Sequence, residues 1–291
     1  MTNTDQLSIL IPAFNEELNI ERTLTELRQQ FADAEIIVVD DGSTDDTASI
    51  ASRMAGVTLV QHSHNTGYGS ALKTAFRRST RAVVAWYDAD GQHRPEDLRA
   101  VVQPVLNGEK DAVIGVRGEE SDVVTTRVPG KRLLKYCAQI VARAPVPDLN
   151  SGLRAFRAEV LKRYLHLLPQ GFSASSTTTL ILMRRGYRLG YAPIQTKARK
   201  GTSTVKIFRD GWRTLQIILR LFVLFDALNF FTALAAVQAI PSLVYGTIIA
   251  LIRDQGFPVL ASTFFISGLL TFFMGVVCDQ IVALRKERFE H

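Results

Sequence analysis

The chain has 291 residues, of which 47% are hydrophobic and 21% are charged, and its formal net charge is +6 at pH 7. This length allows one large domain with a sizeable core plus an appendage. Two cysteines exclude a disulfide framework and fit a reducing compartment. The positive charge gathers late in the chain without the basic-aromatic interleaving typical of nucleic-acid binding, which favours a membrane surface or phosphate ligands.

The first 115 residues alternate between strand-like and helix-like patterns. Short apolar runs typical of buried strands occur at 7–11, 35–39, 58–60, 82–87 and 111–115. We expect the first strand to stop at Pro12. Because helical spacing separates these runs, the pattern predicts an α/β domain with a mainly parallel sheet.

Acidic or amide side chains follow three of these strands. The groups are Asn15–Glu16, Asp40–Asp41, and Asp88 with Asp90. In open α/β sheets ligands bind at the carboxyl ends of the strands, so we expect the three groups to share one rim. Helix capping would explain any one group alone. A crevice that holds a metal ion and the polar parts of a nucleotide explains all three together.

The stretch 85–93 reads Ala-Trp-Tyr-Asp-Ala-Asp-Gly-Gln-His, and the candidate site is organised around it. Asp88 and Asp90 are two residues apart, so both can point to the same face of an extended chain. Two like charges repel each other unless a cation lies between them. A hard divalent ion with oxygen ligands is the expected occupant. A solvated acidic turn is the alternative for the pair taken alone.

The sequence Gly67-Tyr68-Gly69 is similar to a glycine loop that cradles phosphate. It lacks the Gly-Lys-Ser/Thr ending of a P-loop and the full dinucleotide fingerprint. We therefore expect a tight turn from a strand into a helix.

Two long apolar runs lie near the C-terminus. No charged residue occurs from Ala227 to Ile252 or from Gln255 to Cys278. Each run exceeds the roughly 20 residues that a helix needs to cross a bilayer. The polar link at 253–256 predicts a hairpin of two transmembrane helices, at about 227–252 and 256–280. A buried helix pair in a soluble protein is the alternative.

The flanks of this hairpin predict its orientation. The polar N-terminus, residues 1–6, does not resemble a signal peptide, so we expect the bulk of the chain in the cytoplasm. Basic residues precede the first run and follow the second, which places both flanks on the cytoplasmic side. They are Arg209, Arg213, Arg220, Arg285, Lys286 and Arg288. The sequence thus predicts a multi-pass protein of the cytoplasmic (inner) membrane.

The segment before the hairpin has an apolar stripe at helical spacing, beside basic residues. The stripe consists of Phe208, Trp212, Leu215, Leu219 and Phe222. We expect an amphipathic helix in the membrane interface, and a core helix with a basic edge is the alternative. The expected divisions are a catalytic domain at 1–200, the interfacial region at 201–226, the transmembrane pair at 227–284 and a cytoplasmic tail at 285–291.

Five motifs carry a resemblance to a known family. Residues 11–16 (Ile-Pro-Ala-Phe-Asn-Glu), 38–45 (Val-Val-Asp-Asp-Gly-Ser-Thr-Asp) and 88–93 (Asp-Ala-Asp-Gly-Gln-His) resemble those of family-two glycosyltransferases with the GT-A fold. Residues 114–117 (Ile-Gly-Val-Arg) and 148–154 (Asp-Leu-Asn-Ser-Gly-Leu-Arg) are similar to polyprenyl-phosphate glycosyltransferases such as dolichol-phosphate mannose or glucose synthases. The resemblance covers nearly the whole chain.

The resemblance implies a set of site residues. Those matching nucleotide-sugar positions are Pro12, Ala13, Phe14, Asn15, Glu16, Asp40, Asp41, Gly67, Asp88, Ala89, Asp90 and Arg199. Those matching a site for Mg²⁺ or Mn²⁺ are Asp88, Asp90 and Gln92. Those matching the side of the acceptor phosphate are Arg117, Arg127, Lys131, Arg132, Lys135, Asn150, Ser151 and Arg154. Asp88, Asp90, Arg117 and Asp148 are the expected catalytic residues.

The implied function is a metal-dependent, inverting transfer of a hexose from UDP-glucose or GDP-mannose to undecaprenyl or dolichyl phosphate. A hydroxyl acceptor would need a general base, yet residues 171–179 contain no carboxylate. A phosphomonoester with a second pKa of about 6 is already largely ionised and needs cations instead. A membrane glycosyltransferase with a glycan acceptor and a non-catalytic nucleotide-sugar-binding protein stay open as alternatives, as does a homo-oligomer.

Overall fold

The computed structural model describes residues 4–118, 136, 139–140, 144–149, 151–171, 173–195, 216, 219–220, 222–223, 225–253 and 256–290, with side chains as far as 284 in the last helix. The chain divides into two compact units, Met1–Ile207 and Phe208–His291. Each unit is described by itself below.

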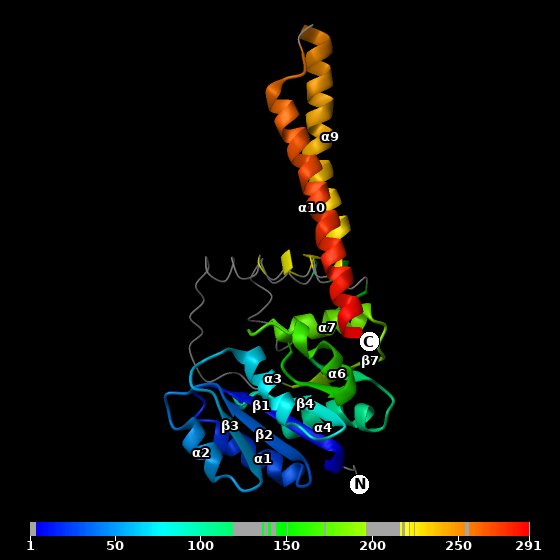
Figure 1. Cartoon of the computed structure of the whole chain (residues 1–291). Coiled ribbons are helices and arrows are strands. Elements are labelled where there is room, and N and C mark those ends of the chain that lie inside the picture. Colours follow the sequence, from blue (N-terminus) through cyan, green and yellow to red (C-terminus); the bar gives the residue numbers. More distant parts are fainter. Residues whose placement is uncertain are drawn as a thin grey trace. The chain divides into compact units, whose positions relative to one another are not determined.

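The first unit is built on a seven-stranded sheet with the order β3-β2-β1-β4-β6-β5-β7 (Figure 1). The strands are β1 (Leu7–Ala13), β2 (Glu35–Asp40), β3 (Val57–Gln61), β4 (Val83–Trp86), β5 (Ala112–Arg117), β6 (Arg154–Arg157) and β7 (Leu189–Ile194). Strand β6 runs antiparallel to β4 and β5, and every other neighbouring pair is parallel. The predicted α/β class with a mainly parallel sheet is confirmed.

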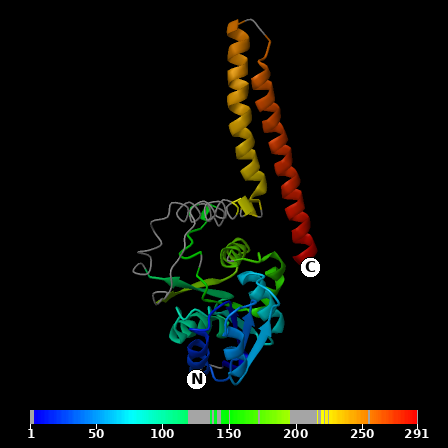
Figure 2. The same ribbon diagram turned by 90° about the vertical axis from the view of Figure 1, so that its left-hand side faces the viewer.

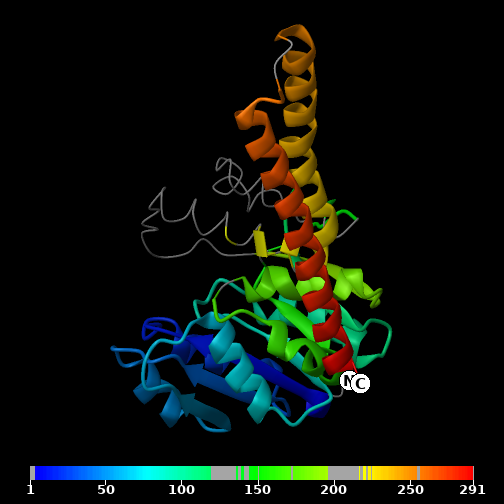
Figure 3. The same ribbon diagram turned by 45° about the horizontal axis from the view of Figure 1, so that its top comes forward.

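Helices connect these strands, as Figures 1 and 3 show. They are α1 (Ile20–Gln30), α2 (Thr47–Arg53), α3 (Tyr68–Arg78), α4 (Pro95–Leu106), α6 (Ala158–Tyr164) and α7 (Ala174–Arg184), with short 3₁₀ turns at Thr4–Gln6 and Leu165–Leu167. Residues of α1 and α4 join the core on one face of the sheet. Helix α3 packs against β1 and β2, and its buried side chains lie outside that cluster.

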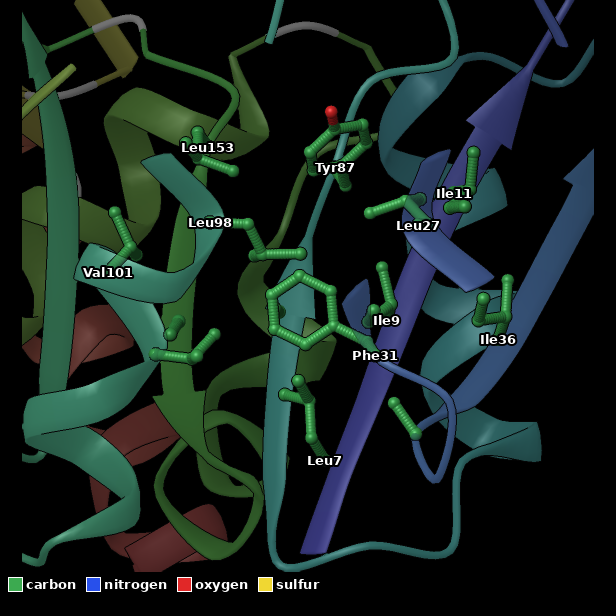
Figure 4. Packing of buried hydrophobic residues seen from close by; sticks show 14 of the residues in the cluster. Leu7, Ile9, Ile11, Leu27, Phe31, Ile36, Tyr87, Leu98, Val101 and Leu153 are labelled. Atoms are coloured by element: carbon green, nitrogen blue, oxygen red, sulfur yellow. The ribbon is translucent and has the colours of Figure 1, made fainter. Parts of the chain in front are cut away.

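The main core lies between β1, β2 and β4 on one side and α1 and α4 on the other. Leu7, Ile9 and Ile11 alternate along β1 and all point into it, as Figure 4 shows. Leu27 of α1 and Leu98 of α4 meet them there, and all five side chains are fully buried. Burying each such side chain contributes about 1.5–3 kcal/mol. The core therefore holds rigidly the strands whose ends carry the acidic groups.

The prediction that the first strand stops at Pro12 is wrong, because β1 continues to Ala13. Pro12 pairs with Val39 of β2 in the register of the sheet. On the β4 side, Leu10 accepts the last hydrogen bond, from the Tyr87 nitrogen at 3.0 Å. Backbone groups alternate between the two neighbours of a strand, so the nitrogen of Pro12 faces the side where β4 has already ended. The proline therefore removes no ladder hydrogen bond.

The short strand β6 was not predicted from the sequence. It reads Arg-Ala-Phe-Arg and lies between β4 and β5, where it is the antiparallel member of the sheet. Four residues with an arginine at each end have too little apolar character for a recognisable strand pattern. This strand delivers the preceding residues, 151–153, to the end of β4.

The second unit contains two long apolar helices, α9 (Ala227–Arg253) and α10 (Val259–Glu290), which pack along each other (Figure 2). The segments Ala227–Arg253 and Val259–Leu284 are long and apolar enough to cross a membrane. The predicted helical hairpin is therefore confirmed. Helix α10 begins later than predicted and continues to Glu290, into the segment expected as a tail.

The two helices of this hairpin approach closely through small residues. A Cβ atom on Gly268 would lie 2.9 Å from Ala239 Cβ and 3.0 Å from the Ala235 oxygen. A Cβ atom on Gly275 would lie 2.4 Å from Phe231 Cβ. Such contacts are typical of helix pairs in membranes, where small residues let the backbones approach.

Candidate active site

The loops that follow β1 and β2 are hydrogen-bonded to each other. Asn15 has a φ of 54°, in the left-handed region that asparagine tolerates better than most residues. Its backbone nitrogen donates to Ser43 Oγ at 2.9 Å, and its side-chain oxygen accepts from the Thr44 nitrogen at 2.9 Å. Glu16 donates its backbone N–H to Thr47 Oγ1 at 2.8 Å. Asn15 and Glu16 are thereby fixed beside the acidic loop after β2.

Asp41, at the end of β2, anchors the loop that leads into α3. Its carboxylate accepts hydrogen bonds from the Thr66 nitrogen at 3.0 Å, Thr66 Oγ1 at 2.8 Å and the Gly67 nitrogen at 2.7 Å. His62 Nδ1 lies 2.7 Å from Oδ1 of the same carboxylate. Burial alone would raise the pKa of Asp41, but these hydrogen bonds outweigh it and lower the pKa. Asp41 is therefore an ionised anchor at neutral pH.

Asp88, just after β4, is held by groups from three other segments. Tyr68 Oη donates to its Oδ1 at 2.9 Å, and His93 Nε2 lies 3.4 Å from its Oδ2. Gly152 lies so close that a Cβ atom there would be 2.0 Å from Asp88 Oδ2. Burial would raise the pKa of Asp88, but the hydrogen bonds from His93 and Tyr68 and the charge of Arg154 lower it. The carboxylate is therefore ionised and fixed in direction.

Asp90 and Gln92 lie in the turn that follows. Gly91 has a φ of 70°, and the Gln92 nitrogen donates to Asp90 Oδ1 at 3.1 Å. Among the described residues, no three His, Cys, Asp or Glu side chains are grouped to hold a metal ion. Asp88, Asp90 and the Gln92 amide nevertheless offer the oxygen donors that Mg²⁺ or Mn²⁺ takes together with the oxygens of a bound diphosphate. That these three residues hold a metal ion stays a prediction.

On the other side of Asp88, Arg117 at the end of β5 forms a two-pronged ion pair with Asp148. Arg117 Nε lies 2.8 Å from Asp148 Oδ2, and its second terminal nitrogen lies 3.1 Å from Oδ1. Asp148 also accepts from the Ser151 nitrogen at 3.1 Å. The side chain of Arg117 keeps 31% exposure, whereas that of Asp148 keeps 11%. The pair holds the partly exposed guanidinium of Arg117 at the end of β5.

Arg154 is fully buried and ties this segment to α7. Its guanidinium donates to the backbone oxygens of Ser151 at 2.7 Å, Ser175 at 2.7 Å and Leu149 at 3.0 Å, and to Thr179 Oγ1 at 2.6 Å. Burial lowers the pKa of Arg154 to about 10, against the opposing effect of Asp148 and other nearby groups, so the side chain stays charged at neutral pH. Direct contact with an acceptor phosphate would require its rearrangement.

The two sides together place ionised carboxylates and an arginine around one edge of the sheet. The family model described as "Glycosyl transferase family 2" matches residues 8–165, more than half of the chain. The chain belongs to glycosyl transferase family 2. The predicted family is therefore confirmed.

Relatives of this family 2 transferase include enzymes named for lipid phosphates. An uncharacterized protein of Methanocaldococcus jannaschii is 33% identical over 71% of this chain and 90% of its own length. UDP-N-acetylglucosamine–dolichyl-phosphate N-acetylglucosaminyltransferase of Methanococcus voltae is 29% identical over 72% of this chain and 94% of its own. Undecaprenyl-phosphate 4-deoxy-4-formamido-L-arabinose transferase of Pectobacterium carotovorum is 31% identical over 55% and 51%. The predicted resemblance to polyprenyl-phosphate glycosyltransferases is confirmed.

Solved structures establish the fold of the transferase. Glucosyl-3-phosphoglycerate synthase of Mycobacterium tuberculosis, in complex with Mn²⁺, UDP and glucosyl-3-phosphoglycerate, has a TM-score of 0.61. It is 23% identical and covers 74% of this chain and 79% of its own. The same synthase in complex with Mg²⁺ and UDP gives a TM-score of 0.61 at 22% identity. The likeness confirms the GT-A fold.

The predicted donor residues of the transferase lie at one edge of the sheet. Pro12 and Ala13 end β1, Asp40 ends β2, and Ala89 lies between the two aspartates after β4. Phe14, just after β1, is 43% exposed and presents an aromatic surface there. Their contact with a nucleotide sugar stays a prediction.

Several predicted residues lie outside the part of the chain that the structure describes. They are Arg127, Lys131, Arg132, Lys135 and Asn150 on the acceptor side, Arg199 on the donor side, and most of the expected interfacial helix. Ser151 lies in a described segment and is 1% exposed.

Three residues of the site were not assigned from the sequence: Tyr68, His93 and Gly152. His93 and Gly152 belong to motifs that were recognised, so their place in those motifs was the available signal. Tyr68 lies between two glycines that suggested only a turn. Its contact with Asp88 joins α3 to the end of β4, which local sequence patterns do not reveal.

Proposed function

We propose that this transferase moves a hexose from a nucleotide sugar, UDP-glucose or GDP-mannose, to a polyprenyl phosphate with inversion at the sugar. The acceptor would be undecaprenyl or dolichyl phosphate. The proposal agrees with the names of the relatives from Methanococcus voltae and Pectobacterium carotovorum. It also accounts for a helical hairpin of transmembrane length in the same chain.

The arrangement of Arg117 and Asp148 supports a phosphate acceptor most directly. Asp148 is the described carboxylate of the predicted acceptor-side segment, and Arg117 engages both of its oxygens. A carboxylate paired in this way is a poor general base, because the cation favours its ionised form. The neighbouring residues 171–179 contain no acid. A phosphate acceptor needs no base, and we propose that Arg117 contacts it.

On the donor side, Asp88, Asp90 and Gln92 would hold Mg²⁺ or Mn²⁺ against the diphosphate. A divalent ion there would stabilise the negative charge that develops on the leaving nucleoside diphosphate. Asn15, Glu16 and Asp40 would lie toward the nucleoside. Because their loops are hydrogen-bonded to each other, these groups need little rearrangement when the donor binds.

The membrane arrangement is part of the proposal. The basic residues on both flanks of the hairpin favour the cytoplasmic side for both ends, with the catalytic unit in the cytoplasm. The phosphate of the lipid would then lie at the cytoplasmic membrane face.

The test is sugar transfer by the full chain in detergent, with Mn²⁺ or Mg²⁺, from a panel of radiolabelled UDP- and GDP-sugars to undecaprenyl or dolichyl phosphate. We expect labelled lipid from one donor and at least about a 100-fold loss of rate with Asp90→Ala. Arg53→Ala, at the end of α2, is the matched surface control and should keep full activity. Donor binding without labelled lipid would favour a glycan acceptor or a non-catalytic nucleotide-sugar protein.

A further inference from the structure

Tyr68 has a contact that the proposed function does not use. It is the first residue of α3, and its hydroxyl donates to Asp88 Oδ1 at 2.9 Å. The hydroxyl is thus a hydrogen-bond donor to the carboxylate.

The backbone around Tyr68 is fixed by close packing. Gly67 has a φ of 99°, and a Cβ atom on it would lie 2.7 Å from the Gln170 oxygen. A Cβ atom on Gly69 would lie 2.0 Å from the Pro169 oxygen. The Gly69 nitrogen donates to the Gln170 oxygen at 2.6 Å. The two glycines thus let the start of α3 press against residues 169–170, which sets the position of Tyr68.

The side chain of Tyr68 is held from a second direction as well. Ser175, in the first turn of α7, hydrogen-bonds to the Tyr68 hydroxyl. Asp88 in turn meets Gly152 on its other oxygen. Three segments therefore contact the Asp88 carboxylate, and Tyr68, itself held by Ser175, is the hydroxyl donor among them.

We propose that Tyr68 is a positioning residue, which directs the Asp88 carboxylate toward the divalent ion and diphosphate of the donor. This inference rests on the proposed metal-dependent function. Groups that orient a ligating carboxylate typically alter metal affinity about 10- to 100-fold when they are removed. Loss of the hydroxyl should therefore weaken metal binding while it leaves the fold and the nucleoside contacts in place.

The experiment compares Tyr68→Phe with Tyr187→Phe in the full chain. Tyr187 also loses one hydroxyl hydrogen bond, to Tyr164 Oη at 3.2 Å, but it precedes β7 at the opposite edge of the sheet. Mn²⁺ binding is measured by electron paramagnetic resonance, once in the presence of UDP and once in the presence of GDP. We expect affinity about tenfold weaker or more in Tyr68→Phe and unchanged in Tyr187→Phe.

Two further measurements separate positioning from a general structural effect. The Mn²⁺ concentration for half-maximal transfer should rise in Tyr68→Phe, whereas kcat at saturating Mn²⁺ should recover. In an Asp88→Ala background, Tyr68→Phe should change Mn²⁺ affinity no further, because its target is gone.

Unchanged Mn²⁺ affinity in Tyr68→Phe, or an equal loss in the Asp88→Ala background, would overturn the inference. A wild-type chain that binds no Mn²⁺ with either UDP or GDP would instead overturn the proposed function itself. The two failures are therefore distinguishable.

Discussion

Single residues set the direction of the Asp88 carboxylate, and Gly152 does so by having no side chain. A Cβ atom at this position would overlap Asp88 Oδ2 at 2.0 Å. A side chain at residue 152 would therefore displace the Asp88 carboxylate, which belongs to the proposed site, rather than side chains of the core.

We therefore expect Gly152→Ala to fold but to lose transfer about 100-fold, because the carboxylate must move by more than an ångström. Gly171→Ala is the matched control, since a Cβ atom there meets nothing within 4 Å. Initial rates and melting temperatures of both variants provide the measurement. Full activity in Gly152→Ala would show that the position of Asp88 is unimportant.

A second prediction for a single residue concerns Arg117. Its fork meets both oxygens of Asp148, a geometry that lysine cannot reproduce. Arg117→Lys should raise the KM for the lipid phosphate about tenfold and leave the KM for the nucleotide sugar unchanged. Steady-state kinetics with each substrate varied in turn would show this. A change confined to the donor KM would move Arg117 to the donor side.

At the scale of elements, Asp111 joins three strands at the edge opposite the candidate site. It precedes β5 and accepts from Arg157 at the end of β6 and from Arg188 just before β7, with terminal nitrogens at 3.2 Å and 3.0 Å. The hydrogen bond from Arg188 is the largest effect on the pKa of Asp111 and lowers it, against the smaller effect of burial.

A carboxyl whose pKa is lowered on folding stabilises the protein above its unfolded pKa of about 3.9, and the effect is lost as the pH falls through the folded value. Asp111→Asn should thus cost about 1 kcal/mol of unfolding free energy at pH 7, and progressively less below pH ~4. Thermal unfolding at a series of pH values tests this. A cost that grows toward low pH would contradict it.

Another prediction concerns the packing of the two helices of the hairpin. Gly268→Ile should drive α9 and α10 apart, since even a Cβ atom meets Ala239 at 2.9 Å. Leu269→Ile, on an exposed position beside it, should have little effect. The two variants are compared by the fraction of each protein that remains monodisperse in detergent after heating. Equal thermal resistance would argue against close helix packing at this point.

Some strands and site residues could be predicted from the sequence, and others could not. The apolar runs predicted five of the seven strands, because buried parallel strands are continuous and β-branched. Pro12 misled the prediction because its effect depends on where β4 ends, and β6 was missed because arginines frame it. The rim aspartates were predictable from their place after strands. Tyr68 and Gly152 were not, since their roles come from contacts between distant segments.

At the scale of the whole molecule, the hairpin predicts the orientation of the chain. If both flanks are cytoplasmic, Gly256 in the link lies on the far side of the membrane and Leu284 on the near side. In a variant without native cysteines, Gly256→Cys should react with an impermeant maleimide in intact cells, and Leu284→Cys only after lysis. The opposite pattern would invert the proposed topology.

The central claim is that the acceptor is a phosphate. The most direct measurement supplies the full chain with Mn²⁺, the productive labelled donor, and either undecaprenyl phosphate or undecaprenol, which differ only in that group. We predict labelled lipid from the phosphate and none from the alcohol, because Asp148, the carboxylate paired with Arg117, is a poor base for a hydroxyl. Equal transfer to the alcohol, or none to either lipid or to dolichyl phosphate while Mn²⁺ and the donor still bind, would contradict a phosphate acceptor.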